Sequence, residues 1–210
     1  MKKIPSLFKR NYDGDRLVFD EIVEGSEWVV AGEGMATRKW DGTSCMVRDG
    51  KLYKRYDAKN GKTPPEGFIP AQDPDPITGH WPGWLLVGNG PEDKQYRSIE
   101  KIVIDDVYDV KFSGTDHLCY RFNSEWVVFY DGTFELCGPR INGNPEGFDT
   151  HVLVMHGGEC LRDCPRDFDG LHEYLATHNI EGIVWWRSAH WDCDKVKIKA
   201  KDFGIKRGCK

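Results

Sequence analysis

Long apolar runs are missing from this sequence of 210 residues. None approaches the roughly 18 consecutive apolar residues that a membrane-spanning helix needs, which excludes a helical membrane protein. The first six residues are basic but contain no apolar segment like that of a secretory signal peptide. We therefore expect no association with a membrane and a cytoplasmic location.

Cysteine pairs at zinc-finger spacing are also missing, although the chain contains seven cysteines. Structural zinc sites usually hold two cysteines separated by about two residues. His156, Cys160 and Cys164 follow one another at intervals of four residues and, with Cys193, leave a zinc site open as an alternative. The simpler interpretation is a set of reduced thiols, because disulfides are rare in cytosolic proteins.

An excess of positive charge is likewise absent, since 29 Lys and Arg against 34 Asp and Glu give a formal net charge of −5. This balance argues against a protein that coats nucleic acid along its length. Basic residues nevertheless gather at both ends of the chain, a pattern compatible with a local phosphate-binding face and equally with solvated termini. They are Lys2, Lys3, Lys9, Arg10, Lys195, Lys197, Lys199, Lys201, Lys206, Arg207 and Lys210.

Strand and turn signals dominate the rest of the sequence. Two Asp-Gly dipeptides, at residues 49–50 and 131–132, each separate a pair of apolar-rich runs. This pattern predicts two β-hairpins with type I′ turns, the first joining 45–48 to 51–55 and the second joining 126–130 to 133–137. The other predicted strands are residues 27–31, 182–186 and 195–199.

One helix and one long loop complete the predicted elements. Residues 169–178 place two leucines on one helical face, and Asp167 or Asp169 is the candidate N-cap. Residues 61–91 are rich in Pro and Gly, which predicts a long loop. Because two hairpins argue for antiparallel sheet rather than alternating β-α-β units, we expect an α+β fold of antiparallel sheets flanked by helices.

Lys39 stands two residues before the Asp41-Gly42 turn, in a run from Thr37 to Thr43 with strand-like sequence on both sides. A lysine acts as a nucleophile only after losing its proton, and the pKa of free lysine is about 10.4. Burial or neighbouring positive charge must therefore favour its neutral form. Taken alone, a lysine beside an Asp-Gly turn is more often a solvated strand end.

Two carboxylates and a pair of lysines follow Lys39 along the chain. Glu135 lies within one predicted strand, and Glu181 opens another. Lys197 and Lys199 alternate on the last strand, so both point to one face. A lysine nucleophile, carboxylates and additional cations are the parts required for nucleotidyl transfer from a nucleoside triphosphate.

The ordered series resembles the motifs of the covalent nucleotidyltransferase superfamily, which contains DNA ligases, RNA ligases and mRNA capping enzymes. Lys39-Trp40-Asp41-Gly42 is similar to motif I, whose lysine becomes attached to the nucleotide. The other matches are Arg55 for motif Ia, Glu135 for motif III, Glu181-Gly182-Ile183-Val184 for motif IV, and Lys197 with Lys199 for motif V.

The segments around these motifs look most like the small 5′-to-3′ RNA ligase 1 family. The chain lacks the arginine that most DNA ligases have two residues after the motif I glycine, here Gly42. The segments that carry the resemblance are residues 53–61, 134–136, 141–145, 181–185 and 203–204.

The resemblance implies a single nucleotidyltransferase (adenylation) domain over residues 1–210, without the C-terminal OB domain of DNA ligases and capping enzymes. It implies an ATP-dependent RNA ligase that joins 5′-phosphate and 3′-hydroxyl RNA ends through a lysyl-AMP and an RNA-adenylate. We expect a monomer that acts in RNA repair. ATP and Mg²⁺, with Mn²⁺ as a substitute, are the implied cofactors.

The residue roles follow from the same resemblance. Lys39, Lys197 and Lys199 would be catalytic, and Glu181 would contact the metal ion. The nucleotide-binding residues would be Lys39, Asp41, Gly42, Arg55, Glu135 and Lys197.

Two other interpretations stay open. A capping-type guanylyltransferase or a DNA ligase-like adenylyltransferase would prefer GTP or would seal nicked duplex DNA. A nucleotide- or RNA-binding module without chemistry would need neither Lys39 as a nucleophile nor Lys197 as its charged neighbour.

Overall fold

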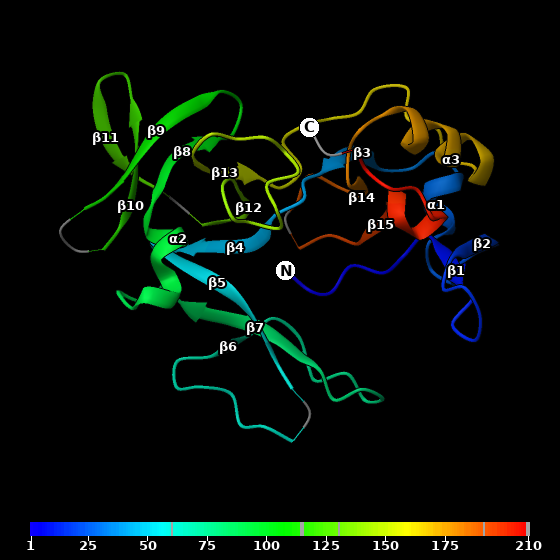
Figure 1. Cartoon of the computed structure of the whole chain (residues 1–210), viewed down its shortest axis with the longest axis horizontal. Coiled ribbons are helices and arrows are strands. Elements are labelled where there is room, and N and C mark those ends of the chain that lie inside the picture. Colours follow the sequence, from blue (N-terminus) through cyan, green and yellow to red (C-terminus); the bar gives the residue numbers. More distant parts are fainter. Residues whose placement is uncertain (60, 114–115, 130, 191, 209–210) are drawn as a thin grey trace. The chain divides into compact units, whose positions relative to one another are not determined.

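The computed structural model of the chain describes residues 1–59, 61–113, 116–129, 131–190 and 192–208 (Figure 1). Asn60, Tyr130, Cys209 and Lys210, to which the sequence-based predictions extend, lie outside the described residues. The chain forms two compact units. The first consists of Met1–Lys3 and Gly42–His156, and the second of Ile4–Asp41 and Gly157–Lys210. A single nucleotidyltransferase domain over residues 1–210 stays a prediction.

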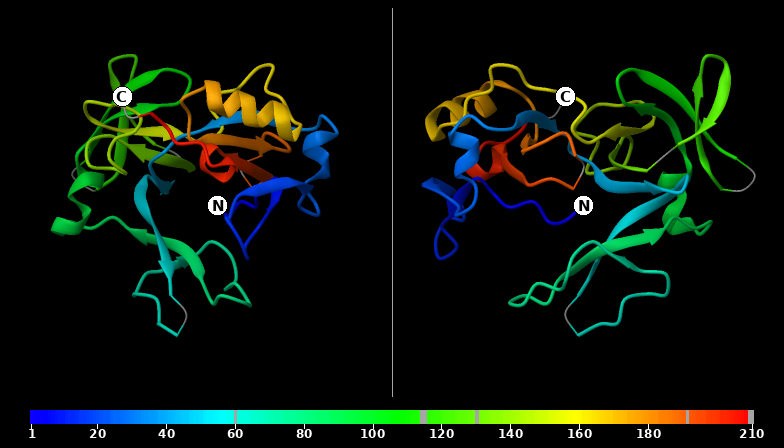
Figure 2. Two further views of the ribbon diagram at one scale, coloured as in Figure 1. Left: turned by 45° about the vertical axis from the view of Figure 1, so that its right-hand side comes forward. Right: turned by 180° about the vertical axis from the view of Figure 1, so that it is seen from behind.

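The second unit is built around an antiparallel sheet with the strand order β15-β14-β3 (Figure 2). β14 (Gly182–Trp186) and β15 (Lys195–Lys199) confirm two predicted strands. β3 (Met35–Lys39) pairs with the other edge of β14. Gly182 lies directly between Lys39 on β3 and Lys199 on β15. Because directly opposite residues point to the same side of a sheet, both lysines share one face.

The opposite face of this sheet packs against α3 (Phe168–Thr177), which runs beside it in Figures 1 and 2. Ile183 and Ile198 from the sheet, with Leu171 and Leu175 from the helix, are each 2% exposed or less. Each such side chain contributes about 1.5–3 kcal/mol by leaving water. This burial fixes which way β15 faces, and so directs its lysines away from α3.

α3 confirms the predicted helix and settles its cap. The carboxylate of Asp167 accepts a hydrogen bond from the backbone N–H of Gly170 at 2.8 Å. An N-cap of this kind satisfies a donor that has no partner within the helix. Asp169, the other candidate, lies in the first turn of the helix.

The prediction of a strand at residues 27–31 is wrong, because these residues form the short helix α1 (Glu27–Val30). The guanidinium of Arg166 donates hydrogen bonds to the carbonyls of Val29 and Gly34, at 2.8 Å each. The bond to Val29 satisfies a carbonyl at the end of the helix and the bond to Gly34 fixes the segment that follows it, which together outweigh the β-propensity of the two valines. The responsible arginine lies more than a hundred residues away in the sequence, so a local pattern could not reveal it.

The N-terminal hairpin of β1 (Phe8–Arg10) and β2 (Val18–Ile22) meets the short helix η2 (Ala200–Phe203) through Asp202. The carboxylate of Asp202 accepts a hydrogen bond from Arg10 at 2.5 Å and one from the backbone N–H of Lys199 at 3.0 Å. Asp202 is 3% exposed, so both bonds are shielded from water.

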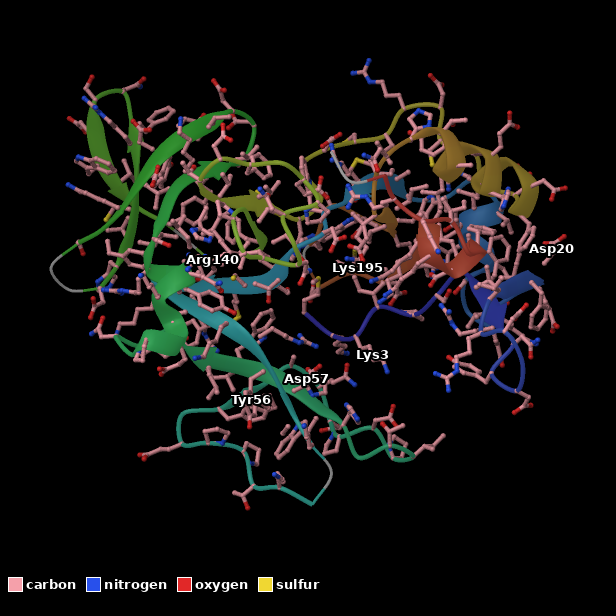
Figure 3. The ribbon with its side chains drawn as sticks, in the orientation of Figure 1. Lys3, Asp20, Tyr56, Asp57, Arg140 and Lys195 are labelled. Carbon is pink, nitrogen blue, oxygen red and sulfur yellow. The ribbon has the colours of Figure 1, made fainter. Side chains whose placement is uncertain are left out.

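Asp202→Ala should lower the free energy of unfolding by about 2 kcal/mol, since the guanidinium of Arg10 and the backbone N–H of Lys199 lose a buried, charged acceptor. Urea denaturation at neutral pH measures the difference. Asp20→Ala is the matched control, because Asp20 lies exposed on β2 (Figure 3), and it should change stability by less than about 0.5 kcal/mol. Equal losses in the two variants would contradict the role given to Asp202.

The first unit contains a ten-stranded sheet, counted over the described residues. Its order is β11 (Glu125–Val128), β10 (Leu118–Phe122), β9 (Val107–Phe112), β8 (Ile99–Val103), β13 (His151–Met155), β12 (Gly132–Cys137), β4 (Thr43–Arg48), β5 (Lys51–Ala58), β7 (Trp81–Leu86) and β6 (Ile69–Pro70). Between β7 and β8 lie η1 (Pro91–Asp93) and α2 (Lys94–Arg97). Neighbouring strands are antiparallel except β13 and β8, which run parallel. The α+β, mainly antiparallel prediction is thus confirmed with one exception.

One of the two predicted hairpins is confirmed and the other is wrong. β4 and β5 pair across Asp49 and Gly50, whose φ angles of 51° and 71° are the positive values that a type I′ turn requires. β11, however, pairs with β10 across Asn123 and Ser124, while β12 pairs with β13 and β4. Asn123 and Ser124 have positive φ angles of 47° and 70°. They form the turn that the sequence analysis missed, because neither is glycine.

The predicted loop over residues 61–91 contains two strands, so that prediction is wrong in part. β7 pairs with β5 along six residues, and β6 pairs with the other edge of β7. Trp84 on β7 is 2% exposed. The ring of Phe68 packs edge-on against Tyr56, which is labelled in Figure 3, and against Trp81. Aromatic burial therefore orders a segment whose Pro and Gly content resembles that of a loop.

No helix within the described part of the chain is both long enough and apolar enough to cross a membrane.

Candidate active site

The second unit gathers three lysines and one glutamate on the face of its sheet opposite α3. Lys39 ends β3, Lys197 and Lys199 alternate on β15, and Glu181 immediately precedes β14. We call these four residues the lysine cluster. The alternation on β15 confirms the sequence-based orientation, since Val196 and Ile198 between the lysines are buried at 2% and 0% exposure.

Glu181 lies between two of the lysines and binds one with each carboxylate oxygen. Oε2 is 2.5 Å from Nζ of Lys39, and Oε1 is 2.6 Å from Nζ of Lys199. The three side chains are 12–19% exposed, so water screens these ion pairs only in part. The arrangement holds the amine of Lys39 in place and, in this state, favours its ammonium form.

Gly182 leaves room for the two lysines to converge. A Cβ atom at this position would lie 2.2 Å from the carbonyl oxygen of Ile198, which is closer than real structures allow. Glycine is therefore required where β14 passes between the edge strands that carry Lys39 and Lys199.

Two residues of the lysine cluster, Lys197 and Glu181, have pKa values below those of the isolated groups. Burial, with the ammonium groups of Lys199 and Lys39 adding to it, lowers the pKa of Lys197 to about 8. Burial alone would raise the pKa of the Glu181 carboxyl, but the ammonium groups of Lys39 and Lys199 outweigh it and lower that pKa. At neutral pH Glu181 is thus an anion, and Lys197 loses its proton more readily than an isolated lysine does.

Asp41, predicted to bind nucleotide, is held by a residue of the C-terminal segment. Its carboxylate lies 3.2 Å from the guanidinium of Arg207, which also donates to the carbonyl of Asn179 at 3.0 Å. Beside it, the guanidinium of Arg38 stacks 3.8 Å from the ring centroid of Trp40. The sequence analysis counted Arg207 only as part of a basic tail, because its partner lies far away in sequence.

Glu135, the other predicted carboxylate, lies in the first unit on β12 and is 7% exposed. One oxygen accepts a hydrogen bond from the backbone N–H of Gly42 at 3.2 Å. The other lies 2.8 Å from Nε2 of His156. His156 was considered only as a zinc ligand, so its pairing with Glu135 was missed. Gly42 and His156 thus fix the positions of the two carboxylate oxygens of Glu135.

Gly42 sits where the backbone at the start of β4 approaches β12 closely. A Cβ atom there would lie 2.2 Å from the carbonyl oxygen of Leu136. Any residue other than glycine at position 42 would therefore clash with β12. The side chain of Asn142 donates to the Gly42 carbonyl at 2.7 Å. These contacts fix the backbone directly after Asp41.

Arg55 lies within β5 rather than at its end, because the strand continues to Ala58. Its guanidinium contacts the carboxylate of Asp57 at 3.3 Å, the carbonyl of Met1 at 2.8 Å and the ring of Trp84 at 5.1 Å. Burial lowers the pKa of Arg55 and Asp57 counteracts it, yet a guanidinium stays charged near neutral pH.

A metal ion is implied by the resemblance, and Glu181 is the carboxylate of the lysine cluster that could contact it. Mg²⁺ commonly takes one or two protein carboxylates and completes its shell with phosphates and water. Within the described ranges, no three His, Cys, Asp or Glu side chains gather closely enough to hold an ion. Glu181 therefore fits a cation shared with a substrate phosphate. The same finding gives no support to a zinc site made by His156, Cys160, Cys164 and Cys193.

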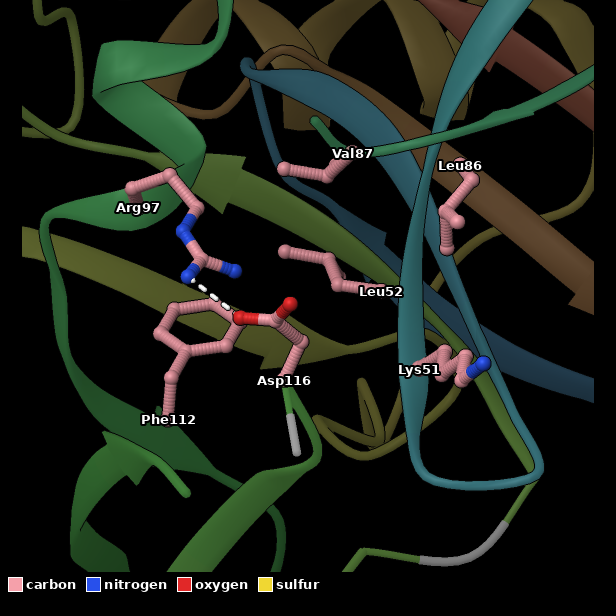
Figure 4. Close-up of a pocket in the computed structure, with 7 residues that line it drawn as sticks. All are labelled: Lys51, Leu52, Leu86, Val87, Arg97, Phe112 and Asp116. Atoms are coloured by element: carbon pink, nitrogen blue, oxygen red, sulfur yellow. Dashed lines mark hydrogen bonds and ion pairs between the residues drawn. The ribbon is translucent and has the colours of Figure 1, made fainter. Parts of the chain in front are cut away.

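A separate pocket in the first unit contains none of the predicted site residues. The guanidinium of Arg97 lies 2.7 Å from the carboxylate of Asp116 and 4.3 Å from the ring centroid of Phe112 (Figure 4). The remaining lining residues are Lys51, Leu52, Leu86 and Val87. Two of its three charged groups, Arg97 and Asp116, are thus paired with each other.

Comparison with known proteins places the chain among RNA ligases. It is 30% identical to the RNA ligase 1 of Pongo abelii over 222 aligned positions, which cover 80% of this chain and 67% of the relative. It is 28% identical to the RNA ligase 1 of Mus musculus, over 72% of this chain and 62% of the relative. The chain thus spans about two thirds of the length of these relatives. No protein-family model matches it. The identity and coverage together show that the chain belongs to the RNA ligase 1 family.

Proposed function

We propose that the protein is an ATP-dependent RNA ligase that joins a 5′-phosphate to a 3′-hydroxyl, acting in RNA repair. The observation that carries the proposal is the lysine cluster, in which Glu181 holds Lys39 beside two further lysines. Membership of the RNA ligase 1 family supports RNA as the substrate class.

In the first step, the unprotonated Nζ of Lys39 would attack the α-phosphorus of ATP. An N–P bond forms, and the bond to the pyrophosphate oxygen breaks. The AMP would then pass to the 5′-phosphate of RNA, and attack by a 3′-hydroxyl would join the ends and release AMP. Lys197 and Lys199 would offset the negative charge that accumulates at the α-phosphate in the transition state.

Lys39 must lose its proton before it can react. The ammonium groups of Lys197 and Lys199 disfavour a third positive charge, whereas the carboxylate of Glu181 favours it. Glu181 would hold a divalent cation, Mg²⁺ or Mn²⁺, whose chemistry there would be polarisation of the phosphate. The contacts of Glu181 with Lys39 and Lys199 support its role in positioning both amines.

The nucleotide-binding roles stay with the residues that the resemblance names. We propose that the nucleotide-binding residues are Lys39, Asp41, Gly42, Arg55, Glu135 and Lys197. The buried hydrogen bonds of Glu135 to Gly42 and His156 support a fixed acceptor for a ribose hydroxyl.

The direct test supplies ATP labelled at its α-phosphate together with Mg²⁺, followed by a single-stranded RNA with a 5′-phosphate. Label should become attached to the protein, and RNA should then yield circles or joined ends. Transfer should fail when a chelator removes the divalent cation. Labelling from GTP in preference to ATP would indicate a capping-type enzyme, and sealing of nicked DNA but not RNA would indicate a DNA ligase. RNA binding without any label on the protein would leave a non-catalytic module.

A further inference from the structure

Trp126 is an exposed residue of β11, the edge strand of the β8–β11 end of the first unit's sheet; these strands are labelled in Figure 1. Side chains alternate along these strands, so that Val110 and Leu118 are buried while Lys111 and Arg121 are exposed. Trp126 is 41% exposed. A large aromatic ring on an outward sheet position loses burial energy unless something covers it.

The residues around Trp126 on this face are basic or aliphatic, apart from Asp109. Arg121 on β10 lies directly opposite Trp126 on β11, and Nζ of Lys111 on β9 lies 4.1 Å from the indole ring centroid. Val107 and Val128 are 55% and 44% exposed. We call this surface the Trp126 face; it consists of Lys101, Val107, Asp109, Lys111, Arg121, Trp126 and Val128.

The charge of the Trp126 face differs in sign from that of the whole chain. It carries three cationic side chains and, opposite Lys101, the acidic side chain of Asp109. The chain as a whole has a formal net charge of −5. An exposed aromatic ring beside cations matches single-stranded nucleic acid, in which flat bases are joined through phosphates.

We propose that the Trp126 face binds single-stranded RNA, with one base stacked on Trp126 and the flanking phosphates paired to Lys111 and Arg121. This inference rests on the proposed RNA substrate and adds a binding surface that includes none of the proposed catalytic residues. β10 and β9 follow β11 in the sheet at a spacing of about 4.8 Å per strand. Arg121 and Lys111 therefore lie on the same side of Trp126, within reach of the backbone of a nucleotide stacked on it.

The contact between Lys111 and Trp126 does not block such stacking. A cation–π contact at an exposed site contributes about 0.5–1 kcal/mol, whereas a base stacked on an aromatic side chain contributes about 1–3 kcal/mol. A base can therefore displace the ammonium of Lys111 from the ring. The displaced ammonium is then close to the phosphate that arrives with the base.

The test uses the full chain and a short fluorescein-labelled RNA of uridines, with affinity measured by fluorescence anisotropy in the absence of ATP. Trp126→Ala should raise Kd by about fivefold to a hundredfold, the range expected from loss of one stacked base. Trp126→Phe should retain most of the affinity, because phenylalanine also stacks. Tyr12→Ala is the matched control, since Tyr12 is 77% exposed and lies in the second unit, and it should leave Kd unchanged.

A second measurement isolates the phosphate contacts. Replacing Lys111 and Arg121 together by alanine should reduce the slope of log Kd against log salt concentration by about 1.4, because each phosphate contact on a single strand contributes about 0.7. An unchanged slope would overturn the assignment of these two cations. Unfolding temperatures equal to that of the wild type would show that the variants are folded.

The outcomes separate this inference from the proposed function. If the wild type takes up AMP from ATP but Trp126→Ala leaves RNA affinity unchanged, the Trp126 face is not an RNA site and the ligase proposal stands. If the wild type takes up no AMP yet Trp126→Ala weakens RNA binding, the face is supported and the ligase proposal fails. If Trp126→Ala only dissociates a dimer of the wild type, the face is a protein interface and the inference is overturned.

Discussion

Lys39→Arg should reduce the attachment of AMP to the protein by at least about a thousandfold, since it removes the proposed nucleophile. Arginine keeps the positive charge and can still pair with the carboxylate of Glu181. The pKa of a guanidinium lies far above neutral pH, however, so arginine presents no lone pair there. The measurement is the amount of protein that carries label after incubation with ATP labelled at the α-phosphate.

The same variant offers an internal control. Lys39→Arg should still join RNA that already carries AMP on its 5′-phosphate, because that step needs no lysine nucleophile. Lys201→Arg, at an exposed lysine of η2, should label like the wild type. Normal labelling of Lys39→Arg would contradict the nucleophile assignment, and loss of the joining step as well would indicate a structural defect.

Lys197→Met should change activity and stability in opposite directions. AMP attachment should fall by about a hundredfold to a thousandfold, the range observed when a preorganised group that stabilises transition-state charge is removed. Stability at pH 7 should rise by about 1–2 kcal/mol, because methionine fills similar space without a partly buried charge. Label transfer and urea denaturation measure the two effects on one preparation.

The stability effect has a defined pH dependence. The pKa of Lys197 is about 8 in the folded protein and about 10.4 in an unfolded chain. Between these values the unfolded chain binds more protons, so the free energy of unfolding of the wild type should rise with pH. The rise should amount to about 2 kcal/mol after allowance for solvent screening.

The Lys197→Met variant should lack this rise, so its advantage over the wild type should vanish by about pH 10. Lys199→Met is the matched control, since Lys199 pairs with Glu181 and its removal should lower stability at neutral pH. A stability advantage of Lys197→Met that persists unchanged at high pH would contradict the assigned cause.

The sequence predicted those elements whose conformation depends on residues close together in the chain, such as turn residues, a helix cap and the alternation of side chains along a strand. The Asp49-Gly50 hairpin, α3 with its Asp167 cap and the alternation on β15 all agree with the structure. Residues 27–31 and 61–91 were misassigned because distant partners decide their conformation, namely hydrogen bonds from Arg166 in one case and pairing with β5 in the other.

The candidate site likewise combines features that the sequence predicted with features that it could not reveal. The order of charged residues along the chain suggested that Lys39, Glu181 and Lys199 act together, and the structure brings these three into contact. The sequence could not indicate that His156 holds Glu135 or that Arg207 holds Asp41. Each of those pairs depends on which strands become neighbours, and no spacing rule encodes that.

The chain order of the second unit has a consequence during synthesis. β3 finds its strand partner in β14, yet Gly42–His156, the bulk of the first unit, is made between them. Domains that emerge early from the ribosome can fold before later segments exist. The inserted segment can therefore fold while β3 is still unpaired, and Lys39 meets Glu181 only after residues 181–199 have been translated. A nascent or prematurely terminated chain would carry Lys39 without its counter-ion, so the proposed chemistry could not begin before the polypeptide is long enough to complete the sheet.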